Sequence, residues 1–533
     1  MKRRNVLTAA GSAALLAACG GGVESDPTPP AEAGASPPAV PPAPPAVPPA
    51  VPPAVPPAPP PSVPPADGEP ATAALAAALV EGQPLRPLAR LRNASVQPGV
   101  FEATLTAAPA SLELRSGTRT TLWTYNGTLP GPLIELAEGD RVRLRLANRL
   151  PQQATTVHWH GMPVPAAQDG NPMDAVRAGS DRAYEFTLPR GSAATYWYHP
   201  HVHGSTHEQV FRGLAGALRV RTADDPLPSQ LIDLTLMFTD LRLDAAAQVA
   251  PNTQRDFTLG REGDRLLVNG SLRPVLTAAP GASHRLRLLN ACNARTLRLA
   301  FDNHRMTLVA TDGGLLGAPV PGLAELLLAP GERAEVVIAF SSDSALRALA
   351  YDRGSMMMMG TARPTEMLMR VRVQGTAVSS LTLPATLRPI ARLPAPVATQ
   401  RFVLGHAMGM GGGGMMGGGG MGGGSFTING RSFAMNRIDT RVRVGATYLW
   451  EVVNADTLDH PFHVHGTQFQ VIERVRGALR QPAPYLAWKD TVNVARGETV
   501  RLLVRLSMPG LRMYHCHILE HEDQGMMGTL LAE

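Results

Sequence analysis

Apolar and polar residues alternate through most of the chain after residue 98, which is the pattern of strands with one buried face. In the stretch DRVRLRL, Val142, Leu144 and Leu146 alternate with three arginines, and we expect these arginines to face solvent. The stretches GASHRLRLLNACN and GATYLWEVVNAD have the same form, with a glycine, alternating apolar residues and a final asparagine. Helical periodicity is scarce, so the pattern predicts an all-β fold.

This strand pattern recurs at a spacing of roughly 150 residues, which is the size of a domain. Each copy follows an Asn-Gly turn, at 126–127, 269–270 and 429–430. The stretches PGERAEVVIAF and ARGETVRLLVRL share a second pattern, a Gly-Glu turn that leads into a strand. We therefore expect three Greek-key β-sandwiches of the cupredoxin-like type in tandem, over residues 98–224, 225–376 and 398–533.

The chain before residue 98 has a different composition. Residues 1–19 combine a basic head, a short apolar stretch and small residues before Cys19, which is typical of an export signal. The stretch LAAC resembles a lipobox that would place a lipid on Cys19, and the arginine pair resembles a twin-arginine signal; the alternative is an ordinary cleaved signal. Residues 20–97 are predicted to be a Pro/Ala-rich linker, in which 27–66 favours polyproline II. These features indicate an exported lipoprotein of the bacterial envelope, facing the periplasm or held in the outer membrane.

The formal charge of +6 comes mostly from arginines that are spread along the strands, so we expect no nucleic-acid partner. The chain has only three cysteines, which excludes a disulfide-rich scaffold. Cys292, in the stretch LLNACNAR, is predicted to be a small buried apolar residue. Cys516 instead lies between two histidines.

Ten of the fifteen histidines fall in four short clusters. All four clusters contain His-x-His, and side chains two residues apart on a strand share one face, where they can hold one metal or two neighbouring metals. Two clusters belong to the first predicted sandwich and two to the last, so a shared site would form where these domains meet. The clusters are HWHG (His158, His160), YHPH (His199, His201), HPFHVHG (His460, His463, His465) and HCHILEH (His515, His517, His521).

The donor types favour copper over zinc, because zinc sites commonly use more thiolates than this chain has. Two imidazoles, a thiolate and a thioether make the blue-copper pattern. The residues that offer this set are His460, His521, Cys516 and Met526. On a strand, the two histidines beside Cys516 point away from its face, so the thiolate would face one copper and its neighbours would face others.

The four clusters, in this order, resemble the four signature segments of the multicopper oxidases. The surrounding sequence is most similar to bacterial three-domain members, the cuprous oxidases and laccase-like enzymes. The resemblance implies four copper ions, with no ligand from the middle sandwich. It assigns the type 1 copper to His460, Cys516, His521 and Met526, the type 2 copper to His158 and His463, and the type 3 pair to His160, His199, His201, His465, His515 and His517. His203 and His207 match no ligand position, and His284 and His304 are expected to be core or surface residues.

The resemblance implies an enzyme that oxidises a reducing substrate one electron at a time and reduces O₂ to water at a trinuclear cluster. Cys516 would connect the two sites, because peptide units join it directly to two cluster histidines. The axial Met526 favours a moderate rather than a very high potential. Asp169 and Glu522 match acids that supply protons in the family, and the alternative is a turn aspartate and a surface glutamate.

Two groups of methionines have unusual positions. The stretch SMMMMG has four in succession, for which a buried strand is the alternative. The Met/Gly-rich segment 408–424 offers almost nothing apolar for methionine to pack against, and thioethers suit Cu(I). Cuprous oxidases resemble this chain in having a Met-rich insert before the type 1 segment. We interpret the segment as a Cu(I)-collecting loop, with flexible low-complexity sequence as the alternative; its methionines are Met408, Met410, Met415, Met416 and Met421.

The substrate region departs from the cuprous oxidase pattern. Asp456 matches an acid that precedes the first type 1 histidine, but Leu458 stands where those enzymes have a methionine, and His406 or Met408 could compensate. Three hypotheses follow: a monomeric cuprous oxidase for envelope copper homeostasis, a laccase-like oxidase of phenols and aromatic amines, or a non-catalytic copper-binding lipoprotein. For the two enzymes, the partners are O₂ and a small reducing substrate.

Overall fold

The structure is a computed structural model that describes residues 79–356, 358–407 and 425–533. Its regular structure is almost entirely β, as the alternating pattern predicts. The export signal, Cys19, the run 27–66 and the Met/Gly-rich segment 408–424 lie outside the described residues. None of the described helices has the length and apolar character needed to cross a membrane.

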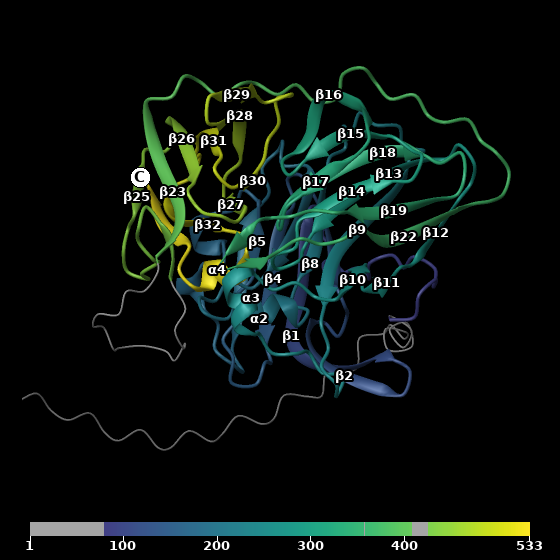
Figure 1. The fold of residues 1–533 in the computed structure, drawn as a ribbon, viewed down its shortest axis with the longest axis horizontal. Coiled ribbons are helices and arrows are strands. Elements are labelled where there is room, and N and C mark those ends of the chain that lie inside the picture. The colour runs from purple at the N-terminus through teal and green to yellow at the C-terminus, as the bar shows by residue number, and fades with distance from the viewer. Residues whose placement is uncertain (1–78, 357, 408–424) are drawn as a thin grey trace, which may run out of the picture. The chain divides into compact units, whose positions relative to one another are not determined.

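Six larger sheets form three sandwiches along the chain (Figure 1). The first sandwich pairs the sheets β2-β1-β4-β6 and β3-β8-β7-β5. Its strands are β1 (Val100–Arg115), β2 (Thr118–Tyr125), β3 (Gly131–Ala137), β4 (Arg141–Asn148), β5 (His158–His160), β6 (Asp181–Thr187), β7 (Ala194–His199) and β8 (Gly216–Arg221). The 3₁₀ turns η1 (Ala166–Gln168) and η2 (Pro172–Asp174) and the helix α2 (Thr206–Phe211) belong to its loops.

The second sandwich pairs β11-β10-β9-β13-β18-β15-β16 with β12-β22-β19-β14-β17, and β20-β21 form a separate hairpin. Its strands are β9 (Ile232–Leu241), β10 (Arg265–Val268), β11 (Ser271–Leu272), β12 (Val275–Ala278), β13 (Ser283–Asn290), β14 (Leu297–Phe301), β15 (Met306–Thr311), β16 (Gly314–Leu323), β17 (Leu326–Leu328), β18 (Arg333–Ala339), β19 (Ser344–Leu349), β20 (Ser355–Met356), β21 (Met359–Gly360) and β22 (Glu366–Val373). The helix α3 (Gln254–Leu259) follows β9.

The third sandwich pairs β24-β23-β26-β31-β28-β29 with β25-β33-β32-β27-β30. Its strands are β23 (Ala398–Ala407), β24 (Ser425–Ile428), β25 (Thr440–Val442), β26 (Thr447–Asn454), β27 (His460–Val464), β28 (Phe469–Arg476), β29 (Leu479–Pro482), β30 (Thr491–Val494), β31 (Thr499–Arg505), β32 (Gly510–Cys516) and β33 (Met527–Ala532). The helix α4 (Leu519–Asp523) lies between the last two strands.

The three sandwiches repeat one topology. In each of them one sheet has a parallel pair near its start, and these pairs are β1 with β4, β9 with β13, and β23 with β26. The opposite sheets have the parallel pairs β3 with β8, β12 with β22, and β25 with β33. A parallel pair cannot be closed by a two-residue hairpin, so the recurrence shows one Greek-key plan used three times.

Asparagines at equivalent positions fix this plan. The turn residues Asn126, Asn269 and Asn429 have positive φ, and each side-chain oxygen accepts a hydrogen bond of 2.8 Å from the first strand of its sandwich. The strand-ending asparagines donate to two backbone carbonyls each and accept from the amide two residues later; they are Asn148, Asn290 and Asn454. These asparagines therefore have a turn-forming role that the sequence pattern indicates.

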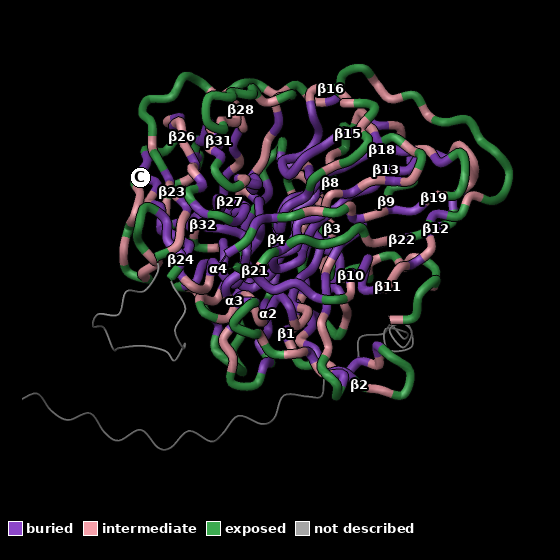
Figure 2. The backbone as a smooth tube through the Cα atoms, viewed as in Figure 1, coloured by how far each residue is buried: buried purple, intermediate pink, exposed green. Residues whose placement is uncertain are grey.

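Each sandwich encloses its own apolar core, and Figure 2 shows buried segments running through the middle of all three. On β4 the expected alternation holds, with Val142, Leu144 and Leu146 buried and Arg141 and Arg145 exposed. Cys292 is buried in the second core, as predicted.

The stretch GASHRLRLLNACN has the same form as DRVRLRL, so its arginines are also expected to face solvent. This prediction is wrong for β13. Every residue of β13 is buried, including Arg285 and Arg287. Their guanidinium groups bind Glu335, and Arg287 also donates to Thr195 of the first sandwich. The first sandwich covers this face of the sheet, and buried carboxylates replace water as partners.

Part of the predicted linker is also packed. Within the range 20–97, residues 79–97 lie along the edges of two sandwiches. The amide of Leu85 donates to Val275 on β12, and the amide of Leu91 donates to Leu133 on β3. Edge strands leave unpaired backbone groups, and this segment satisfies some of them.

Candidate metal centre

The four histidine clusters meet between the first and third sandwiches. In the first, His158 on β5 pairs in register with His199 on β7; in the third, His463 on β27 pairs with His515 on β32. Rings also stack across the boundary, since His158 lies 3.8 Å from His465 and His160 lies 3.7 Å from His463, centroid to centroid. All ten clustered histidines are fully buried. The structure thus brings together the histidines that the sequence singles out.

One group of three rings converges on a single point. The Nε2 atoms of His201, His465 and His515 lie 3.1 to 3.2 Å from one another. Three imidazole nitrogens at this separation suit one metal ion held between them. These rings come from both sandwiches, so neither sandwich alone could form this site.

The remaining cluster histidines surround two further positions. The Nε2 atoms of His158 and His463 lie 3.4 Å apart, and each ring turns its Nδ1 to a backbone carbonyl, that of Asp169 or of Asp490. The rings of the third group have centroids 4.9 to 5.7 Å apart; they are His160, His199 and His517. The type 3 assignment of six histidines therefore divides into two groups of three.

The free ring nitrogens show how these histidines would bind a metal. His199 directs Nδ1 to the Pro200 carbonyl at 2.8 Å, which leaves Nε2 buried without a hydrogen-bond partner among the described residues. His160 is reversed: Nε2 contacts Asp490 and Thr491, and Nδ1 has no such partner. Both ring nitrogens of His517 lack one. Buried imidazoles are normally hydrogen-bonded, so these atoms fit metal ligands.

Burial also sets the charge of these rings. It lowers the pKa of His515 to about 3, and it lowers the pKa of the other affected rings well below the usual value; these are His160, His199, His201, His463, His465, His517 and His521. Neighbouring imidazoles lower the pKa further in each of these rings. Neutral imidazole is the form that binds metals, so the site holds its ligands ready.

A second candidate site lies on the other face of β32. The Sγ atom of Cys516 is 3.4 Å from Nδ1 of His460, and His521 completes a buried group of two imidazoles and a thiol. The far Nε2 atoms bind Asp456 and the Thr258 carbonyl, while Nδ1 of His521 has no partner among the described residues. Met526 is fully buried. Burial raises the pKa of the Cys516 thiol, so a metal is needed to hold it as thiolate.

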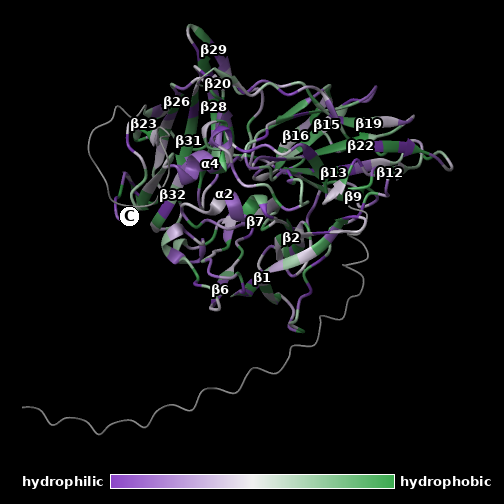
Figure 3. Cartoon of the chain, turned by 60° about the horizontal axis from the view of Figure 1, so that its bottom comes forward, coloured by the Kyte–Doolittle hydropathy of each residue, from purple (hydrophilic) through white to green (hydrophobic). Residues whose placement is uncertain are grey.

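Helix α4 carries His521 and is buried although its sequence is hydrophilic (Figure 3). Both carboxylate oxygens of Glu522 lack a hydrogen-bond partner among the described residues, and they lie 3.5 Å from Nδ1 of His201 and 3.2 Å from Nδ1 of His515. Burial raises the pKa of Glu522, and the charge of Asp523 adds to that rise. The alternative interpretation of Glu522 as a surface glutamate is wrong, because its buried carboxylate faces the histidine cluster.

Asp169 faces the same cluster from the first sandwich. Its carboxylate lies 3.2 Å from Nδ1 of His158 and 3.4 Å from Nδ1 of His465, and it is fully buried. Arg512 approaches it at 3.5 Å. Both acids singled out in the sequence therefore contact the rings of the cluster, on different histidines.

The sequence gives no indication of a third acid, Asp490. Its Oδ1 lies 3.0 Å from Nε2 of His160, and its backbone carbonyl lies 2.8 Å from Nδ1 of His463. Asp490 follows Lys489 just before β30, with no histidine nearby in the sequence. Only the pairing of β27 with β30 brings it to the cluster.

Asp456 links a histidine of the second site to a partly exposed histidine. One carboxylate oxygen lies 3.2 Å from Nε2 of His460, and the other lies 3.0 Å from Nδ1 of His406, which is 23% exposed. Burial alone would raise the pKa of Asp456, but the hydrogen bond with His460 holds it below the usual value. Leu458 and Met356 are buried in the same core, whereas Met358 is fully exposed, so SMMMMG is not simply a buried strand.

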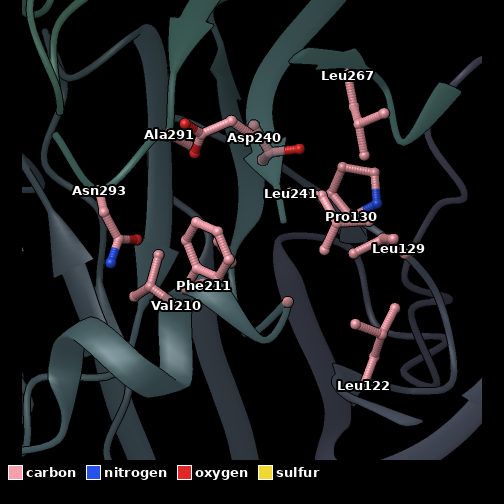
Figure 4. Close-up of a pocket in the computed structure, with 13 residues that line it drawn as sticks. Leu122, Leu129, Pro130, Val210, Phe211, Asp240, Leu241, Leu267, Ala291 and Asn293 are labelled. Carbon is pink, nitrogen blue, oxygen red and sulfur yellow. The ribbon is translucent and has the colours of Figure 1, made fainter. Parts of the chain in front are cut away.

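The other predicted residues lie apart from these sites. His284 and His304 each direct Nδ1 to a nearby backbone carbonyl in the middle sandwich, and His207 contacts Asp523 at 2.6 Å. A pocket between α2 and β9, lined by Phe211 and Asp240, is shown in Figure 4. Its volume of about 20 Å³ has room for one or two water molecules, which excludes it as a substrate site.

Comparison with known proteins agrees with this arrangement. Three family models described as multicopper oxidase match residues 106–225, 234–351 and 414–533. The multicopper oxidase mco of Staphylococcus haemolyticus is 33% identical over 414 residues, covering 76% of this chain and 83% of that protein. The chain belongs to the multicopper oxidase family. Membership implies a copper-dependent oxidoreductase that uses O₂ and a reducing substrate, and the histidine and cysteine groups described above fit copper.

Two further relatives are a solved structure of a multicopper oxidase and a protein with a different name. A solved structure titled as a multicopper oxidase from Campylobacter jejuni, a metallo-oxidase, has a TM-score of 0.79 and 39% identity, covering 85% of this chain and 96% of that one. The cell division protein FtsP of Escherichia coli K12 is 32% identical over 440 residues, covering 80% of this chain and 89% of that protein. The family therefore includes both an oxidase and a protein named for cell division.

Proposed function

We propose that this multicopper oxidase oxidises Cu(I) in the bacterial envelope and couples that oxidation to the four-electron reduction of O₂ to water. The proposal gives the chain four coppers: a type 1 ion at the Cys516 site, a type 2 ion between His158 and His463, and a type 3 pair at the two three-histidine groups. Bound copper supplies one-electron transfer and O₂ chemistry. The predicted lipid on Cys19 would hold the protein, as a monomer, at a membrane surface.

The chain's own residues support this coupling. Cys516 is joined to His515 and His517 by single peptide units, and Nδ1 of His515 lies 3.0 Å from the Cys516 carbonyl. The two sites are therefore connected both by covalent bonds and by a hydrogen bond. Glu522 and Asp169 lie beside cluster histidines, where they can move protons that O₂ reduction consumes.

The observation that carries the choice of Cu(I) is the link from His406 through Asp456 to His460. His406 lies just before the Met/Gly-rich segment in the sequence. The soft thioethers of that segment are therefore next in the chain to an imidazole that contacts Asp456, and Asp456 contacts the type 1 ligand His460. Leu458, at the position of a methionine in cuprous oxidases, favours the laccase-like alternative. The relative named FtsP favours a non-catalytic role.

Deleting residues 408–424 should lower Cu(I) oxidation while raising the oxidation of a bulky phenol. In this proposal the segment collects Cu(I) through its thioethers and keeps bulky substrates out, so its deletion would remove both effects. The measurement is steady-state O₂ uptake with Cu(I) and with the phenol, each with and without added Cu(II).

A length-matched variant separates thioether chemistry from access. Replacing the five methionines of the segment by serine should lower Cu(I) oxidation without raising phenol oxidation. If both variants oxidise Cu(I) at the wild-type rate, the proposal of a Cu(I) substrate is wrong and the laccase-like function is preferred.

A further inference from the structure

The middle sandwich carries none of the assigned ligands, yet one of its turns lies against two of the clustered histidines, His160 and His517. The turn lies in the PGER stretch before β18, and Gly331 there has a φ of +85°. A Cβ atom on Gly331 would lie 2.9 Å from Cδ2 of His517 and 3.1 Å from Cε1 of His160. Only a glycine therefore lets this backbone reach the two rings.

Arg333, two residues further on, binds Asp490 through both ends of its guanidinium group. Nη1 donates to Oδ1 at 2.7 Å and Nη2 donates to Oδ2 at 2.6 Å. The remaining N–H groups donate to three backbone carbonyls, those of Thr195, Gly331 and Asp312. Arg333 and Asp490 are both fully buried, and the planar fork of arginine fixes the carboxylate in one orientation.

Asp490 in turn fixes two cluster histidines, one with its carboxylate and the other with its backbone carbonyl. Oδ1 lies 3.0 Å from Nε2 of His160, which leaves Nδ1 of that ring to face the cluster. Its backbone carbonyl lies 2.8 Å from Nδ1 of His463, which leaves Nε2. Asp490 is close enough to these rings to be considered a ligand itself. Its carboxylate oxygens, however, already accept hydrogen bonds from Arg333 and Thr491.

We propose that Arg333 and Asp490 form a clamp by which the copper-free middle sandwich positions His160 and His463 for the trinuclear cluster. Both are positioning residues, because neither side chain faces the copper positions with a free ligand atom. The clamp determines which ring nitrogen of His160 faces the metal. This inference rests on the proposed ligand roles of the two histidines.

The test is the replacement Arg333→Lys, which keeps the positive charge but removes the fork. Partners of metal-binding histidines typically change metal affinity by about 10- to 100-fold. The concentration of a copper chelator that removes half of the non-blue copper should therefore fall by about 10- to 100-fold. The chelator concentration that removes the blue absorbance should stay as in the wild type, because the Cys516 site has no contact with the clamp. The variant Asp490→Asn should behave in the same way.

Arg287→Lys is the matched control. Arg287 is also a buried arginine of the middle sandwich that reaches Thr195, but it binds Asp233 and Glu335 and no histidine. This variant should keep the wild-type chelator dependence of both kinds of copper.

Three results would overturn the clamp. The first is a soluble variant of Arg333 or Asp490 that loses its non-blue copper at the wild-type chelator concentration. The second is a variant that loses blue and non-blue copper in parallel, and the third is that both variants are insoluble while Arg287→Lys is soluble. If Arg333→Lys alone is insoluble, Asp490→Asn decides. A wild-type protein that binds no copper would instead contradict the proposed function, so the two failures are distinguishable.

Discussion

Replacing Cys516 by serine should abolish the blue absorbance and reduce O₂ uptake to background in a protein that remains folded. The serine hydroxyl is nearly isosteric with the thiol, but it is a hard donor that does not ionise at neutral pH and cannot replace a thiolate. Cys516 is also the residue through which the two candidate sites are connected. Absorbance, O₂ uptake and thermal unfolding of the purified variant are the measurements.

Cys292→Ser provides the control, because Cys292 is the other described cysteine and is equally buried. It lies in the core of the middle sandwich, so its replacement should leave colour and O₂ uptake intact, at a cost in stability of about 1–3 kcal/mol. A blue, active Cys516→Ser protein would contradict the assignment of the type 1 site.

Replacing Glu522 by glutamine should lower the turnover number for O₂ reduction by about 10²-fold, within the range attributed to general acid catalysis. Glutamine keeps the size of the side chain but has no carboxyl proton to transfer to the cluster beside His201 and His515. Asp169→Asn removes the second carboxylate and should lower turnover as well. The measurement is turnover as a function of pH. The rate at which the reductant bleaches the blue absorbance should be unchanged in both variants.

Glu520→Gln tests whether any buried acid of α4 would have the same effect. Glu520 is equally buried, but its carboxylate accepts from the amide of Arg261 and from Asn293 and contacts no cluster histidine. We expect wild-type turnover in this variant. If Glu522→Gln and Asp169→Asn both retain the wild-type rate and pH profile, these acids do not transfer protons.

Local patterns in the sequence predict the fold and the histidine cluster well. Equivalent turns are predicted by the Asn-Gly pairs at Asn126, Asn269 and Asn429, because a type I′ turn needs positive φ at both central residues. His-x-His on a strand predicts a shared face because side chains alternate. Both rules depend on residues close together in the chain.

Features made by contacts between sandwiches are not predictable in this way. Arg287 has the spacing of a solvent-facing residue, and only the covering first sandwich and Glu335 make it a buried one. Asp490 and Arg333 lie 157 residues apart, and neither is near a histidine in the sequence. Burial against a distant element determines the role of each of these residues, and no local periodicity encodes it.

The link through Asp456 was predicted only in part. The resemblance to cuprous oxidases identifies Asp456, but the contact with His406 comes from the parallel pairing of β23 with β26. Glu522 is a similar case: the family resemblance suggests its role, and the fold of α4 directs its carboxylate to two histidines, His201 and His515.

The copper content and O₂ stoichiometry of the purified, copper-supplied protein test the central claim most directly. We predict a blue protein with four coppers per chain that consumes one O₂ for every four reducing equivalents and releases no hydrogen peroxide. A folded protein without blue absorbance and without O₂ uptake would contradict the account and indicate a non-catalytic member of the family.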